Sequence, residues 1–126
     1  MGAVAIVTDS SCDLPAALVE ELGITIVHQG VLNKFDGYER ILADTHFTDA
    51  DVAYMGDDIV DLSVLGRAGL SACPADAVAE VQAKVDWISR FPGGSGAVRE
   101  LIELVLSAQN RWDGVVATYT TEGQRA

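Results

Sequence analysis

Short apolar segments rich in β-branched residues alternate along this chain with stretches in which apolar residues recur at helical spacing. Apolar runs of this kind are typical of parallel strands that helices cover on both faces. The pattern therefore predicts an α/β fold with a mostly parallel sheet. The strands are expected at residues 4–7, 24–27, 52–55 and 70–73, with a shorter fifth strand at 87–88.

The predicted helices fall between these strands. The clearest one follows the only glycine-rich loop, residues 93–96, and carries a single apolar stripe over residues 98–108. The first helix begins at a capping residue, Asp13, and ends before Gly23. Toward the C-terminus the signal fades, and residues 115–117 either extend a helix or pair at a sheet edge. Three further helices are expected at residues 33–44, 59–65 and 77–85.

The composition is that of a folded, acidic domain. With 126 residues the chain makes one domain, because a domain takes about 150 residues on average. Hydrophobic residues make up 49% and charged residues 21%, which excludes an intrinsically disordered chain. Nineteen acidic residues against eight basic ones give a net charge of −11. Such a surface repels phosphate backbones and anionic lipids, so neither nucleic acid nor membrane is expected as a partner.

The lack of export signals in this sequence predicts a cytoplasmic location. The first basic residue is Lys34, so the N-terminus has no charged region of the kind that opens a secretory signal. No apolar run reaches the roughly 18 residues that a membrane span needs. Cys12 and Cys73 lie far apart in the chain, and without an export signal free thiols are favoured over a disulfide.

Acidic residues gather after the third predicted strand. In a parallel sheet, ligands bind at the carboxyl ends of the strands. Gly56-Asp57-Asp58 follows the third strand directly, and Asp61 comes one turn later. These carboxylates either cap a helix N-terminus or bind Mg²⁺, which takes one or two carboxylates, waters and a substrate phosphate. Lys34 follows the second strand and is either a plain surface lysine or a cation that offsets phosphoryl charge in the same cleft.

Several segments match a known family in order and spacing. They are Leu22-Gly23-Ile24, Gln29-Gly30, Asn33-Lys34, Val52–Asp58, Asp61, Gly69-Leu70 and Gly93–Glu100. Together they resemble the capless sugar-phosphate phosphatases of the haloacid dehalogenase superfamily, of the KDO-8-phosphate phosphatase type, over about residues 22–113. The resemblance implies a Rossmann-like three-layer sandwich, Mg²⁺-dependent hydrolysis of a phosphorylated sugar through an aspartyl-phosphate, and homotetramers.

The resemblance also implies roles for single residues. Asp57 corresponds to the direct Mg²⁺ ligand, and Asp58 and Asp61 correspond to acids that support the metal and its water. Lys34 corresponds to the phosphate-site lysine, and Thr8 to the Ser or Thr at a strand end that hydrogen-bonds the phosphoryl group.

The glycine-rich segment before the last predicted strong helix corresponds to a loop that contacts substrate in these tetramers. Its candidates here are Gly94 and Arg99.

One part of the family pattern is missing from these 126 residues. The first motif, a strand ending in Asp-x-Asp-Gly, supplies the nucleophile and the general acid/base and would lie before residue 1. Weak or absent turnover by the isolated chain is therefore expected. The missing strand lies in the middle of the family's sheet, so the sheet is expected either to pair again across the gap or to expose an edge that seeks another chain. A homo-oligomer is the expected assembly.

The front segment departs from the family as well. Where the family has Gly-Arg after the strand-end Thr, this chain has Asp9-Ser10, and residues 4–24 resemble the opening of the DegV family of fatty-acid-binding proteins. A natural divergence, a truncated gene or a constructed chimera would each give this sequence. Two alternatives to a phosphatase follow. One is a small lipid-binding module in which Thr8, Ser10 and Ser11 hold a fatty-acid carboxylate, and the other is a self-associating fragment without a ligand.

Overall fold

A five-stranded parallel sheet forms the centre of the protein. The computed structural model describes residues 4–7, 24–27 and 34–125, and the order of the strands is β2-β1-β3-β4-β5. All neighbouring strands pair in parallel, which confirms the predicted α/β class. The strands are β1 (Val4–Val7), β2 (Ile24–Val27), β3 (Val52–Met55), β4 (Leu70–Cys73) and β5 (Trp87–Ile88).

The strand order reverses its direction between β1 and β3. From β1 the chain moves outward to β2, and it then returns to the other side of β1 to form β3, β4 and β5 in turn. Strand β1 pairs directly with β3, with Ala5 opposite Val52 and Val7 opposite Tyr54. Of the two arrangements expected for a sheet without the family's first strand, the structure shows the one that pairs across the gap.

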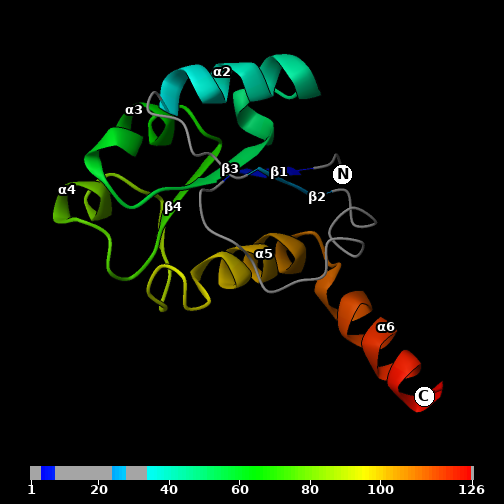
Figure 1. Ribbon diagram of the computed structural model, residues 1–126. Helices are drawn as coiled ribbons and strands as arrows, with labels where there is room; N and C mark the ends of the chain where they lie inside the picture. The colour runs from blue at the N-terminus through cyan, green and yellow to red at the C-terminus, as the bar shows by residue number, and fades with distance from the viewer. Residues whose placement is uncertain (1–3, 8–23, 28–33, 126) are drawn as a thin grey trace.

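Helices cover both faces of the sheet and make three layers (Figure 1). Helices α2, α3 and α4 lie on one face, and α5 lies on the other. The C-terminal helix α6 projects from the body of the molecule. The helical segments are α2 (Lys34–Thr45), η1 (Asp49–Asp51), η2 (Ile59–Asp61), α3 (Leu62–Leu65), α4 (Ala79–Gln82), α5 (Ala97–Ala108) and α6 (Trp112–Arg125).

Alternation along the strands divides the core in two. Successive side chains of a strand point to opposite faces. On β3, Val52 and Tyr54 pack with α2, α3 and α4, whereas Ala53 and Met55 pack against α5. All four are buried, so β3 is apolar throughout, as a central strand covered on both faces must be. The carboxyl end of β3 is thereby held rigidly from both sides.

Two helices differ from the predicted ones, and in a third place the structure decides between two predicted alternatives. The segment expected at 59–65 is a 3₁₀ turn followed by one turn of α-helix, because Asp58 caps Ile59–Asp61 separately. The helix expected at 77–85 is shorter and spans Ala79–Gln82, and it begins late because the amide of Val78 donates to the carbonyl of Asp57. Residues 115–117 belong to α6, where the burial of Val115 against α5 decides for a helix over an edge strand. The helix expected after Asp13 lies outside the described residues.

Candidate functional site

The acidic loop, residues 56–61, starts where β3 ends. Strand β1 ends at Val7, in register with Tyr54, and the loop begins two residues beyond Tyr54. This is the carboxyl edge of the sheet at the point where the strand order reverses, which is the usual ligand-binding position in open α/β sheets. The topology therefore places three carboxylates at the edge where a ligand is expected to bind.

One of these carboxylates points into the protein. The side chain of Asp61 is buried, with the residue only 2% exposed. Its Oδ1 accepts a hydrogen bond of 2.8 Å from the Tyr54 hydroxyl, and its Oδ2 accepts from the backbone amides of Asp57 and Asp58 at 3.1 and 3.3 Å. A buried carboxylate is stable only when such donors replace water. Asp61 thus ties the loop to the core.

The approach of Asp61 also explains the glycine that opens the loop. A Cβ atom at position 56 would lie 2.5 Å from Cβ and 2.6 Å from Cγ of Asp61, far closer than real contacts allow. Gly56 is therefore required by the space that the Asp61 side chain occupies.

The other two carboxylates are on the outside of the loop. Asp57 and Asp58 are exposed, and Oδ1 of Asp58 accepts the amide of Ile59 at 2.7 Å. Within the residues that the structure describes, no group of three or more metal-binding side chains forms a complete cage. Two exposed carboxylates nevertheless fit the donor chemistry of Mg²⁺, which keeps several waters and needs only one or two protein oxygens.

The remaining predicted residues lie on other elements. Lys34 is the first residue of α2 and is half-buried. The Arg99 guanidinium pairs with Glu103 at 3.1 Å and lies 5.4 Å from the centre of the Trp112 ring. Gly94 has a φ of 76° in the loop before α5. Thr8 and Ser10 lie outside the described residues, so the structure groups only the three aspartates.

A buried carboxylate at the start of α5 was not predicted from the sequence. Glu100 accepts hydrogen bonds from the Ser89 hydroxyl at 2.9 Å and from the Arg90 amide at 2.8 Å, and its other oxygen pairs with the Arg90 guanidinium. Burial alone raises the pKa of Glu100, but these donors outweigh it and hold the pKa below its usual range. The contact ties the end of β5 to α5 and so orders the glycine-rich loop between them.

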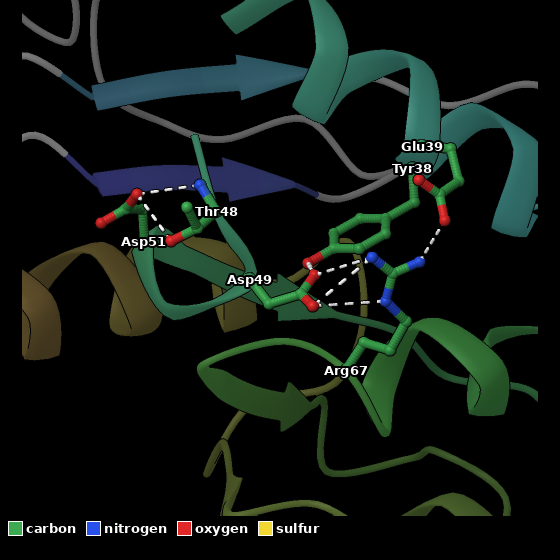
Figure 2. A network of polar contacts seen from close by, with 6 residues as sticks. All are labelled: Tyr38, Glu39, Thr48, Asp49, Asp51 and Arg67. Atoms are coloured by element: carbon green, nitrogen blue, oxygen red, sulfur yellow. Dashed lines mark hydrogen bonds and ion pairs between the residues drawn. The ribbon is translucent and has the colours of Figure 1, made fainter. Parts of the chain in front are cut away.

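An arginine-centred network holds α2 in place (Figure 2). The Arg67 guanidinium pairs with Glu39 and with Asp49, and Asp49 also accepts the Tyr38 hydroxyl at 2.7 Å. The same guanidinium lies 5.1 Å from the ring centres of Phe35 and Tyr38. We call Tyr38, Glu39, Asp49 and Arg67 the Arg67 network. It links the first turns of α2, which begins with Lys34, to the segment before β4.

A free cysteine lies in the core on the side of the sheet that α2, α3 and α4 cover. Cys73 is a free, buried thiol whose pKa is raised by burial, which agrees with a structural role.

An apolar hollow of about 270 Å³ lies between α5 and the starts of β3 and β4. The hollow is at the amino edge of the strands, away from the acidic loop. None of the helices in the described ranges is long and apolar enough to cross a bilayer.

Comparison with known sequences identifies a family. Residues 19–101 match the haloacid dehalogenase-like hydrolase family. The chain is 39% identical over 111 residues to the 3-deoxy-D-manno-octulosonate 8-phosphate phosphatase of Yersinia pestis, which covers 88% of this chain and 59% of that protein. The phosphatase of the same name from Escherichia coli K12 is 38% identical over 110 residues, with 87% and 58% covered. The chain thus spans about three fifths of the length of these curated relatives.

Solved structures show the same similarity. The phosphatase from Yersinia pestis superimposes with a TM-score of 0.69 at 38% identity, covering 89% of this chain and 60% of that one. The phosphatase from Moraxella catarrhalis, solved in complex with magnesium ion, phosphate ion and KDO, superimposes with a TM-score of 0.71 at 33% identity, covering 93% and 67%. Sequence and fold agree, and the chain belongs to the haloacid dehalogenase-like hydrolase family.

Proposed function

We propose that this chain carries the Mg²⁺- and phosphate-binding part of a sugar-phosphate phosphatase site. The observation that carries the proposal is the acidic loop, with two exposed carboxylates at the reversal point of the sheet and a third buried beneath them. The relatives named as 3-deoxy-D-manno-octulosonate 8-phosphate phosphatases support a phosphorylated sugar acid as the class of substrate.

Each candidate residue has a role in this proposal. Asp57 and Asp58 hold Mg²⁺, while Asp61 keeps their backbone in place. When bound, Mg²⁺ neutralises phosphoryl charge and makes phosphorus more electrophilic. Lys34 adds a cation for the phosphoryl oxygens, and Thr8 donates a hydrogen bond to the same group.

The sugar part of the substrate is assigned to the glycine-rich segment. We propose contacts from Gly94 and Arg99, with Ser10 from the segment after β1. Release of Arg99 from Glu103 and Trp112 is then part of substrate binding, because its guanidinium is engaged by both.

Turnover by these 126 residues alone is proposed to be weak or absent. No Asp-x-Asp-Gly sequence occurs in them, and without a nucleophile the covalent route has nothing to attack phosphorus. A metal site without that motif also loses one of its carboxylates, so the proposed binding of Mg²⁺ and phosphate rests on Asp57, Asp58 and Lys34.

Self-association is a second proposal, with its own supporting observation. Ile59 and Val60 of the acidic loop are 58% and 56% exposed, and Val78 beside them is 37% exposed. Apolar side chains grouped at one edge favour contact with another chain. We propose a homo-oligomer, a tetramer as in the resembled family, in the cytoplasm. An oligomer whose stability ignores Mg²⁺ would instead favour a non-catalytic fragment.

The first experiment separates binding from turnover. Mg²⁺ binding is measured by calorimetry, and phosphate release is measured over a panel of sugar phosphates with and without Mg²⁺. The proteins are wild type, Asp57→Asn and Asp44→Asn, which removes the same charge from an exposed position on α2. We expect Mg²⁺ binding in wild type and Asp44→Asn and its loss in Asp57→Asn. Equal Mg²⁺ affinity in all three proteins would contradict the proposed site.

A further inference from the structure

Tyr54 is a core residue whose polar end reaches the acidic loop. It lies on β3, is only 2% exposed and packs on the face that α2 and α3 cover. Its ring meets the Tyr38 ring edge-on, with centroids 6.3 Å apart and an interplanar angle of 89°. Packing therefore leaves the Tyr54 ring little freedom, and its hydroxyl is aimed at Oδ1 of Asp61.

The bond to Asp61 continues into the backbone of the loop. The hydroxyl of Tyr54 takes one carboxylate oxygen, and the other oxygen holds the amides of Asp57 and Asp58. Both oxygens of the Asp61 carboxylate are engaged, and at 2% exposure bulk water does not compete for them. The orientation of the two exposed residues thus depends on a hydroxyl in the core.

We propose that Tyr54 is a positioning residue that presents Asp57 and Asp58 to Mg²⁺ by fixing the Asp61 carboxylate. The inference rests on the proposed function, because it takes these two aspartates as the Mg²⁺ ligands. Tyr54 itself does not touch the metal. Partners that orient metal ligands in this way change metal affinity by about 10- to 100-fold when they are removed.

Tyr38 offers a matched control within the same core. It is fully buried, and its hydroxyl donates to an aspartate at 2.7 Å, against 2.8 Å for Tyr54. The acceptor differs, because Tyr38 bonds Asp49 of the Arg67 network and not the acidic loop. Tyr38→Phe and Tyr54→Phe therefore remove the same atom from two buried rings of one core, and only one of them frees Asp61.

The test has two readouts on wild type, Tyr54→Phe and Tyr38→Phe. The first is the hydrogen-exchange rate of the Asp57 and Asp58 amides by NMR, corrected for the global stability of each protein. We expect about a 10-fold increase in Tyr54→Phe and no change in Tyr38→Phe. The second is the Kd for Mg²⁺ alone, expected to rise about 10-fold in Tyr54→Phe and to stay at the wild-type value in Tyr38→Phe.

The results separate the positioning role of Tyr54 from the proposed Mg²⁺ site. Unchanged amide exchange in Tyr54→Phe, or the same change in both variants, would overturn the positioning role. Faster exchange with an unchanged Kd would overturn it too, since the loop would then bind Mg²⁺ without help from Tyr54. If wild type takes up no Mg²⁺, the proposed function fails, while the exchange rates still show whether Tyr54 orders the loop.

Discussion

Replacing Gly56 by alanine tests whether the acidic loop is built around the buried Asp61 side chain. The added methyl group would lie 2.5 Å from Cβ, 2.6 Å from Cγ and 2.8 Å from Oδ2 of Asp61. The loop cannot relieve this by a rotamer change, because Cβ of Asp61 is itself among the atoms too close. Asp61 must move, and its bonds to Tyr54 and to the amides of Asp57 and Asp58 then lengthen or break.

The cost follows from these contacts. Inserting a methyl group into a packed site costs about 1–3 kcal/mol. A lost hydrogen bond to a charged group adds about 1.5–3 kcal/mol. We expect Gly56→Ala to lower the free energy of unfolding by roughly 3 kcal/mol, measured by urea denaturation at constant m-value. Gly66→Ala is the control, because the nearest contact of its added methyl group, with the carbonyl oxygen of Leu62, would be an ordinary 3.5 Å and its backbone is already helical.

The two variants should differ in sign as well as size. Gly66→Ala is expected to be neutral or to gain up to about 1 kcal/mol, since alanine restricts the unfolded chain. If Gly56→Ala unfolds at the same urea concentration as Gly66→Ala, Asp61 does not occupy the space beneath the loop, and the reasoning on the acidic loop is refuted.

Three further predictions concern charged groups away from the loop. The pKa of Glu100 is lower in the folded protein than its unfolded value of about 4.3, so the ionised carboxylate stabilises the fold above that pH. This stabilisation is lost as the pH falls, so the unfolding of Glu100→Gln should depend less on pH between about 5 and 3 than that of wild type. Burial and the bond to Asp49 raise the pKa of Tyr38, so stability should fall above about pH 10, and Tyr38→Phe should reduce that fall in alkaline urea titrations. Arg67→Met should lower the free energy of unfolding, because two ring contacts and two ion pairs are lost, and Arg67→Lys should not restore them. An acid slope unchanged by Glu100→Gln, an alkaline slope unchanged by Tyr38→Phe, or full rescue by lysine would each contradict the corresponding assignment.

Local signals in the sequence located most of the parallel sheet. Strands β3 and β4 are short, mostly apolar runs bounded by polar, glycine or proline residues, and their period and composition are visible without any partner. The same holds for α5, whose apolar stripe is continuous. The position of Asp57 and Asp58 after β3 was also predictable, because parallel strands bring their carboxyl ends to one edge.

Burial of particular polar groups was not predictable, because it depends on residues distant in the chain. The spacing of residues in the sequence does not distinguish a buried from an exposed aspartate at positions 58 and 61. Only Asp61 points inward, where it accepts a hydrogen bond from Tyr54. Glu100 is buried by contacts with residues ten and eleven positions earlier, and Arg67 pairs with Glu39 across 28 positions. The local pattern of apolar and polar residues carries no information on such distant partners.

The sequence by itself determined the fold class, the family and the edge of the sheet where the chemistry gathers, since these follow from local periodicity and motif spacing. Only the tertiary structure decided that β1 pairs with β3, that Asp61 lies beneath the loop while Asp57 and Asp58 face outward, and that the C-terminal residues form a helix. The physical reason is that pairing and burial are set by contacts between segments far apart in the chain, which compete for the same space and the same hydrogen-bond donors only once the chain is folded.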